Sequence, residues 1–279
     1  MKIAILGSSG AMGSFFVVYF LGRGYQVVGH DRVRGIGPAP PRFTFSPSNS
    51  DAVRGSDVVL IAVPIRDSVK VLREVAGSIG KGTLVVEISS VKGKSLGQVK
   101  RIVARSNASL LSLHPLFGPS ISSQRFKLCV VGTKEDVRLA RKLFPRARLI
   151  RLGTEEHDRL MAYVLSLVHL TNLAFVSAIS KGVGMKRFQT ASTPTSMAQL
   201  EVAKAILSQN PSLYSYIQSQ NPFVNEVVDS MISELEDLRK IVGSRQAGRF
   251  EARFSSLGST FDRRDLRRAL DAVYSSSAR

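Results

Sequence analysis

The chain has 279 residues, of which 44% are hydrophobic and 22% charged, and its formal net charge is +18. These values exclude a disordered chain and allow two modest domains with cores of their own. The basic residues are interleaved with acids, and no dense Lys/Arg block with aromatic residues occurs. We therefore expect a surface that suits small anionic ligands, and neither nucleic acid nor a membrane as a partner.

A single cysteine, Cys129, excludes an intrachain disulfide and favours a reducing, cytoplasmic setting. The first predicted strand begins at residue 2, so no signal peptide is predicted. Residues 160–180 lack charge for long enough to span a bilayer. The run includes His169 and Asn172, however, and a buried helix at a subunit interface explains it better. The few histidines and the one cysteine lack metal-ligand spacing, so no metal site is predicted.

The N-terminal residues have the pattern of a dinucleotide-binding βαβ unit. Residues 2–6 and 26–30 predict buried strands, and residues 11–21 predict a buried helix. The spacing Gly-x-x-Gly-x-x-Gly between the first strand and the helix favours a turn that binds a pyrophosphate at the helix N-terminus. A tight turn without a ligand is the alternative. The loop residues predicted to contact the cofactor are Gly7, Ser8, Ser9, Gly10, Ala11, Met12 and Gly13.

Asp31 ends the second predicted strand. It follows the glycines by about 20 residues, where a carboxylate binds the ribose hydroxyls of NAD. Arg32 and Arg34 come next and could instead bind the 2′-phosphate of NADP. Because a carboxylate repels that phosphate, the sequence predicts NAD, with NADP as the alternative, and places Asp31 and Arg32 beside the cofactor.

Strands and helices alternate as far as residue 152. After a Gly/Pro-rich loop at 33–48, a strand at 57–63 ends on Val63-Pro64, at the sheet edge where we expect both residues to meet the cofactor. Further strands are predicted at 83–88, 109–113, 128–131 and 149–152, with helices ending near 106 and spanning 134–144. The order predicts an α/β fold with a doubly wound, mostly parallel, Rossmann-type sheet.

No strand pattern follows residue 153. Thr154 is a predicted N-cap of a helix that runs to about Lys181, with acids after it that suit a first turn. Thr193 and Pro194 begin a second helix, and an apolar stripe ending at Val242 marks another. We predict a dinucleotide-binding domain at 1–152 and an all-helical domain at 153–279 that forms a homodimer through its apolar face.

Two segments at the carboxyl ends of strands could carry chemistry. His114 is suited to act as a general base that removes a hydroxyl proton during hydride transfer. The alternative, with equal weight, is that it only caps a strand by bonding to backbone. Ser90 reads first as a helix N-cap, a role that leaves room for a second one.

The motifs Ser-Ser-Val-Lys at 89–92, His-Pro-Leu-Phe-Gly-Pro at 114–119 and Glu-Glu-His-Asp-Arg-Leu-Met at 155–161 follow the glycine loop in this order. Together they resemble the prephenate/arogenate dehydrogenases of tyrosine biosynthesis, over residues 2 to about 217. The resemblance implies oxidative decarboxylation of prephenate to 4-hydroxyphenylpyruvate, with hydride transfer to NAD.

The resemblance also implies roles for single residues. His114 matches the histidine that deprotonates the substrate hydroxyl, Ser90 the serine that fixes this hydroxyl and His114, and His169 a substrate-pocket histidine. His157 is interpreted as structural. Ala205 stands where the family commonly has an arginine that binds a substrate carboxylate. We expect Lys186 or Arg187 to bind that carboxylate in its place.

Three alternatives stay open at this point. The chain could be an arogenate dehydrogenase or another NAD(P)-dependent hydroxy-acid dehydrogenase. A β-hydroxy-acid enzyme would place a catalytic lysine on the first long helix, where the only lysine, Lys181, lies at the far end. Third, an NAD-sensing regulator could use the basic surface to bind nucleic acid.

Overall fold

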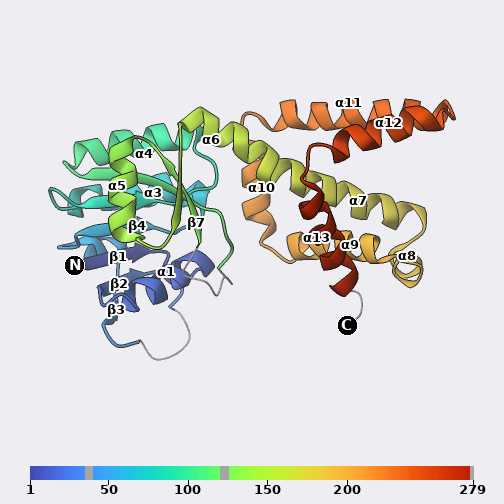
Figure 1. Ribbon diagram of the computed structural model, residues 1–279. Helices are drawn as coiled ribbons and strands as arrows, with labels where there is room; N and C mark the ends of the chain where they lie inside the picture. Colours follow the sequence, from blue (N-terminus) through green and yellow to red (C-terminus); the bar gives the residue numbers. More distant parts are fainter. Residues whose placement is uncertain (35–39, 120–125, 277–279) are drawn as a thin grey trace. The chain divides into compact units, whose positions relative to one another are not determined.

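A computed structural model describes residues 1–34, 40–119 and 126–276. The chain forms two units (Figure 1). The first comprises Met1–Met161 with Ser219–Pro222, and the second Ala162–Gln218 with Phe223–Arg279.

The first unit is built on one eight-stranded sheet with the order β3-β2-β1-β4-β5-β6-β7-β8. Neighbouring strands are parallel except β6 and β7, which are antiparallel. The strands are β1 Lys2–Leu6, β2 Gln26–His30, β3 Phe43–Phe45, β4 Val58–Ile61, β5 Leu84–Glu87, β6 Ser109–Pro115, β7 Lys127–Val131 and β8 Arg148–Leu152. The predicted doubly wound, mostly parallel sheet is confirmed.

Helices cover both faces of this sheet. They are α1 Ala11–Leu21, α2 Asn49–Val53, α3 Ile65–Val75 with the 3-10 turn η1 Ala76–Ser78, α4 Gly93–Arg105, α5 Lys134–Leu143 and α6 Thr154–Met161. The helices α1 and α5 pack on one face, and α2, α3 and α4 on the other. In β1, Ile3 and Ile5 join the first core and Ala4 and Leu6 the second, because successive side chains of a strand point to opposite faces.

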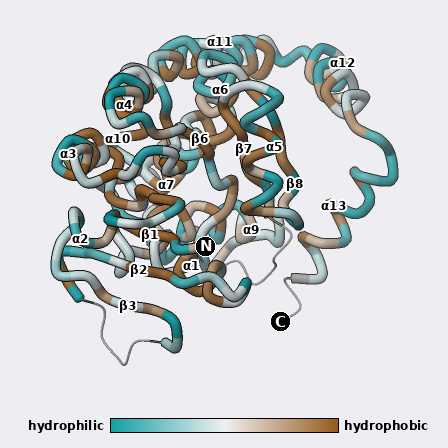
Figure 2. Tube along the Cα trace, turned by 90° about the vertical axis from the view of Figure 1, so that its left-hand side faces the viewer, coloured by the Kyte–Doolittle hydropathy of each residue, from teal (hydrophilic) through white to brown (hydrophobic). Residues whose placement is uncertain are grey.

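The helix α1 is apolar along its length and appears brown in Figure 2. Phe16 and Phe20 are fully buried and stack on each other, with ring centroids 6.1 Å apart. Burial of each ring contributes about 1.5–3 kcal/mol. Strong packing on both sides of the first βα turn therefore fixes the glycine loop at the carboxyl end of β1.

Three predictions about the bounds of helices, strands and loops were wrong. The loop predicted at 33–48 contains the short edge strand β3, which pairs with β2; its Gly35, Gly37 and Pro38 lie outside the described residues. Strand β6 extends to Pro115, so His114 belongs to the strand and pairs with Cys129. Thr154 is the first residue of α6 and not its cap, since the backbone N–H of Gly153 donates to Glu156 Oε2 at 3.0 Å.

The described part of the second unit is all helical, as predicted. Its elements are the π-helical turn η2 Ala162–Leu167, α7 Val168–Gly182, α8 Met185–Thr190, α9 Pro194–Leu207, α10 Pro211–Gln220, which ends in the first unit, α11 Val224–Gly243, α12 Ala247–Gly258 and α13 Arg263–Ser276. Thr193 caps α9, since its side chain accepts from the N–H of Ser196. Helix α8 was not predicted.

Large apolar side chains stay exposed on the second unit. They include Val164, Val168, Leu173, Leu235, Val242, Phe250 and Phe254. The continuous helix Thr154–Gly182 is long and apolar enough to cross a membrane by length and composition alone, which is weak evidence. His169 and Asn172 within this helix both hydrogen-bond to other side chains. Exposed apolar helix faces of this size fit burial against a partner.

Candidate active site

The glycine loop lies where the order of the sheet reverses. The chain leaves β1 for β2 on one side and returns to β4 on the other, and ligands bind at such switch points in open α/β sheets. Gly7 has φ +88°, and a Cβ there would lie 2.8 Å from the carbonyl of Ala62. A Cβ on Gly13 would collide with the carbonyl oxygen of Gly7. Only glycine therefore fits at these two positions, which brings α1 close to β1.

Several polar groups of this loop fit a bound dinucleotide. The hydroxyl of Ser8 is buried and has no hydrogen-bond partner among the described residues. Gly10 is the N-cap of α1 and provides no side-chain cap, so the first N–H groups of the helix stay available to a phosphate. Asp31 accepts from the N–H of Ser9 at 3.0 Å and from that of Arg32 at 2.8 Å. These bonds hold the carboxylate at the end of β2, beside the loop.

The other predicted cofactor residues frame the same edge. Val63 is half-buried and Pro64 exposed, directly after β4 and before α3. The side chain of Arg32 is exposed. Arg34 lies over the ring of Phe45, 5.5 Å from its centroid, in a cation–π contact.

His114 lies near the carboxyl end of β6 and is only 4% exposed. Its Nδ1 lies 2.9 Å from Nε2 of His157, which is fully buried. Burial, together with the neighbouring His157 and Lys92, holds the pKa of His114 well below its ordinary value. His114 Nε2 makes no hydrogen bond with a described residue. The ring is thus a neutral base whose Nε2 is not engaged by the described residues.

Asp158 holds the far side of His157. Its Oδ1 lies 2.8 Å from Nδ1 of His157 and accepts from the N–H of Lys92 at 2.9 Å, while Oδ2 accepts from the N–H of Gly93 at 2.6 Å. Burial would raise the pKa of Asp158, but these hydrogen bonds outweigh it and the pKa is lowered. The side chain amide of Asn221 donates to the backbone carbonyl of Asp158 at 2.7 Å. Asp158 is therefore a fixed, ionised carboxylate.

Lys92 and Glu87 form a buried ion pair under this site. Nζ of Lys92 donates to Glu87 Oε1 at 2.5 Å and to the carbonyl of Leu113 at 2.7 Å. Glu87 also accepts from the hydroxyls of Ser89 and Ser112. Burial raises the pKa of Glu87, but Lys92 and the hydrogen bonds outweigh it and lower the pKa. The pair ties β5 to β6 next to His114.

Ser90 is half-buried in the loop between β5 and α4. The prediction that it is a helix N-cap was wrong, because the N-cap of α4 is Lys92. Its side chain makes no hydrogen bond within the described part of the chain. The structure thus shows no bond from Ser90 to His114, whose Nδ1 is paired with His157 instead. The contact of Ser90 with a substrate hydroxyl stays a prediction.

A second polar cluster lies within the second unit. His169 is 8% exposed, its ring centroid lies 4.3 Å from that of Tyr214, and its Nδ1 lies 3.1 Å from Nε2 of Gln218. Burial lowers the pKa of His169. Ser166, on the π-helical turn, is fully buried, and its hydroxyl has no partner among the described residues. A neutral imidazole and a buried hydroxyl without a partner suit a polar ligand.

Lys186 and Arg187 are both exposed on α8, and Ala205 is exposed on α9. The two cations therefore lie on a short helix, α8, which the sequence analysis did not predict. Their place in substrate binding stays a prediction.

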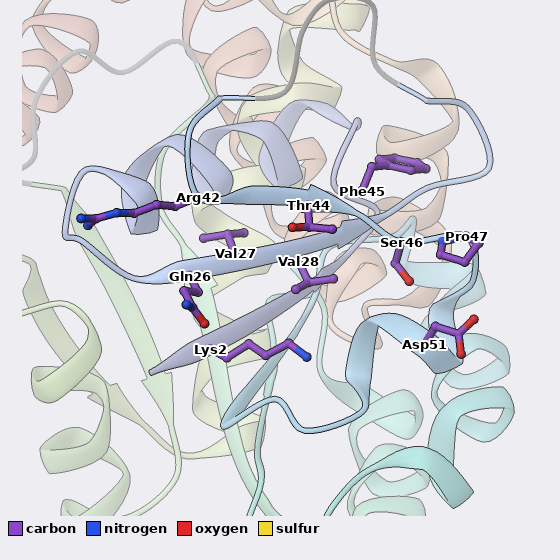
Figure 3. A pocket seen from close by; sticks show the side chains of 10 residues that line it. All are labelled: Lys2, Gln26, Val27, Val28, Arg42, Thr44, Phe45, Ser46, Pro47 and Asp51. Carbon is purple, nitrogen blue, oxygen red and sulfur yellow. The ribbon is translucent and has the colours of Figure 1, made fainter.

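One hollow, of about 560 Å³, lies along β2 and β3 (Figure 3). Two of the charged groups that line it are engaged elsewhere: Lys2 donates to the carbonyl of Arg54, and Asp51 pairs with the guanidinium of Arg54. No histidine or cysteine is among the described residues that line the hollow. It offers no acid–base chemistry comparable to that around His114.

Two domains of one family match the sequence. The nucleotide-binding domain of prephenate dehydrogenase matches residues 41–126, and the dimerization domain of prephenate dehydrogenase matches residues 153–256. Together the matches cover more than half of the chain. The chain belongs to the prephenate/arogenate dehydrogenase family.

Among its relatives in this family is a protein of Methanocaldococcus jannaschii named "Probable arogenate/prephenate dehydrogenase", 26% identical, with 88% of this chain and 57% of the relative covered. The T-protein of Enterobacter agglomerans is 26% identical over 77% of this chain and 55% of its own length. This chain thus spans a little over half of these two relatives. A 4-amino-4-deoxyprephenate dehydrogenase of Streptomyces pristinaespiralis is 26% identical, with 79% and 78% covered.

Two solved structures of the family share the fold. The prephenate dehydrogenase of Aquifex aeolicus, in complex with hydroxyphenyl propionate and NAD+, has a TM-score of 0.76 at 16% identity and covers 93% of this chain and 96% of its own. The arogenate dehydrogenase of Synechocystis has a TM-score of 0.71 at 14% identity, with 93% and 98% covered.

Sequence reasoning missed four residues of the site: Glu87, Lys92, His157 and Asp158. Two of them, His157 and Asp158, belong to the Glu-Glu-His-Asp motif, whose acids looked like ordinary first-turn residues of a helix. The structure instead turns Asp158 toward the N-terminus of α4, a partner more than 60 residues away. The only available signal was the family resemblance of the Ser-Ser-Val-Lys and Glu-Glu-His-Asp motifs.

Proposed function

We propose that this chain is an NAD-dependent prephenate dehydrogenase, which converts prephenate to 4-hydroxyphenylpyruvate. The observation that carries the proposal is His114, a buried histidine kept neutral by its surroundings, with an Nε2 that makes no hydrogen bond to a described residue. Membership of the family and the glycine loop that fits a dinucleotide support it. A neutral histidine can accept the proton that an alcohol loses when it is oxidised by hydride transfer.

The reaction needs a proton acceptor and a hydride acceptor. Bound NAD supplies the hydride acceptor for the ring carbon that carries the hydroxyl. Nε2 of His114 takes the hydroxyl proton as the carbonyl forms. When the ring carboxylate leaves as carbon dioxide, its electron pair makes the ring aromatic, and the resulting phenolate oxygen takes the proton back from His114. Ser90, in the loop after β5, would donate to or accept from the same hydroxyl and so orient it.

The carboxyl ends of the strands would bind the cofactor. We assign the pyrophosphate to residues 7–13, the ribose to Asp31, and flanking contacts to Arg32, Val63 and Pro64. The preference for NAD over NADP rests on the repulsion between Asp31 and a 2′-phosphate. On this assignment, residues 1–152 are the cofactor domain.

Residues 153–279 would bind substrate and form a homodimer of a cytoplasmic enzyme. His169 is neutral and buried, so it would act as a hydrogen-bond partner of the substrate. Because Ala205 replaces the arginine that commonly binds a substrate carboxylate in this family, Lys186 or Arg187 would bind that carboxylate instead. The exposed apolar faces of α7 and α11 support dimerisation, and light scattering that gives a monomer mass at micromolar concentration would contradict it.

Arogenate is the alternative substrate. Arogenate differs from prephenate only in its side chain, which carries an amino group in place of the keto group, and relatives carry both names. The reaction at His114 would be the same. Another hydroxy-acid dehydrogenase and a nucleic-acid-binding regulator have less support, because no observation favours them.

A panel of assays tests the proposal. Formation of NADH or NADPH is followed with prephenate and with arogenate, each with NAD and with NADP. We expect the highest kcat/KM for prephenate with NAD. A higher value with arogenate or with NADP would correct the substrate or the cofactor, and no turnover of either substrate would refute the proposed function.

A further inference from the structure

Three side chains in a row determine which nitrogen of His114 carries the proton. Ionised Asp158 can only accept hydrogen bonds, so Nδ1 of His157, 2.8 Å away, must carry a proton. When His157 carries this one proton only, its Nε2 accepts, and Nδ1 of His114, 2.9 Å away, donates. This leaves the lone pair of His114 on Nε2, the nitrogen that makes no hydrogen bond to a described residue.

We propose that His157 is a positioning residue that, with Asp158, holds His114 in the tautomer with a basic Nε2. The inference rests on the proposed function for its catalytic meaning and on the hydrogen bonds alone for the tautomer. A free imidazole exchanges between two tautomers, and only one of them can accept a proton at Nε2. The hydrogen bonds that link Asp158, His157 and His114 disfavour the tautomer that carries its proton on Nε2.

Asp158, at the end of this row of hydrogen-bonded side chains, is held in place by several bonds of its own. Asp158 accepts from the N–H groups of Lys92 and Gly93 at the start of α4, where the helix dipole also favours a negative charge. Asn221 binds the backbone of Asp158 from a separate segment of the chain. Asp158 and His157 are 2% and 0% exposed, so water does not compete for either. The carboxylate therefore cannot turn away from His157 without losing several hydrogen bonds.

The same hydrogen-bonded row of side chains offsets the positive charge that the reaction creates on His114. When Nε2 of His114 takes up a proton, a second cation forms in a buried site that already holds Lys92. His157 donates to Asp158 and accepts from His114, so the negative charge of Asp158 stabilises the new imidazolium through one intervening ring. Besides burial, His157 itself lowers the pKa of His114, so its own part is the tautomer, and the negative charge of Asp158 offsets the new imidazolium.

Two substitutions of His157 separate these contacts. The side chain of Asn is long enough to replace Nδ1 and to donate to Asp158, but it does not reach His114. The side chain of Gln extends to the position of Nε2 and offers an amide oxygen to His114. We expect His157→Asn to lower kcat on the order of a hundredfold with KM almost unchanged, and His157→Gln to stay within about tenfold of the wild type.

Nitrogen-15 NMR of the imidazoles tests the tautomer without substrate, so its outcome does not depend on the proposed function. We expect the proton of wild-type His114 on Nδ1, the same in His157→Gln, and a mixture of tautomers in His157→Asn. A wild-type His114 protonated on Nε2 would overturn the proposal. Equal kcat values for the two variants would also overturn it. Because the wild-type spectrum alone decides the tautomer, a variant that fails to fold does not remove the test.

Discussion

The buried pair of Lys92 and Glu87 makes a sharp prediction about stability. Their side chains are 0% and 5% exposed, so Lys92→Met leaves a carboxylate in the core without its cation. Removing one partner of a buried ion pair costs about 3–5 kcal/mol. The variant also loses the bond from Nζ to the carbonyl of Leu113, next to His114. We expect destabilisation of the first unit at the upper end of this range.

The matched control is Arg54→Met. Arg54 pairs with Asp51 at 2.9 Å, but the two side chains are 66% and 43% exposed, and such a pair contributes at most about 1 kcal/mol. The double variant Glu87→Gln with Lys92→Met should recover most of the loss, because a neutral amide replaces the unpaired charge and can still bond to Ser112.

Hydrogen exchange of the β5 and β6 amides measures the free energy of unfolding of the first unit by itself. This matters because two units need not unfold together. Since 1.4 kcal/mol is a factor of ten, Lys92→Met should speed the exchange of these amides by about a thousandfold or more. A change as small as that of Arg54→Met would show that the pair is solvated or neutral, and would refute the reasoning.

Three further predictions concern the site. Because the pKa of His114 is lowered, kcat/KM should fall only below pH 6.5, the ordinary value for histidine, and stability should also fall there, since the unfolded chain takes up this proton first; an acid limb above that pH contradicts it. Asp31→Ser should raise the KM for NAD and improve the relative use of NADP, and a wild type that already prefers NADP overturns this. Arg187→Ala or Lys186→Ala should raise the KM for prephenate several-fold and leave that for NAD unchanged; two variants with wild-type KM would exclude both cations.

The dinucleotide-binding unit could be predicted because its signals are local. Residues 2–31 contain the two apolar strands, the apolar helix and the three glycines. Packing in the folded protein agrees with the structure that these local patterns predict. Strand β3 was missed because three residues are too few to show an alternation of apolar and polar side chains. Its strand conformation depends on pairing with β2. Prediction worked where a short segment decides its own structure.

The chemistry around His114 could not be predicted in the same way. Its position was found from a motif, but its partner His157 is 43 residues away, and Asp158 is 66 residues from Lys92. A buried Asp and an exposed first-turn acid look alike in sequence. Only the fold, which brings the start of α6 against the start of α4, tells the two apart.

His114 is the residue on which the proposed reaction depends most. The direct test is the rate of NADH formation from prephenate by wild type and by His114→Ala, with NAD affinity measured on both. We predict that the variant loses kcat by on the order of a hundredfold or more, as for a lost general base, and binds NAD like the wild type. A variant that turns over prephenate at nearly the wild-type rate would contradict the assignment of His114.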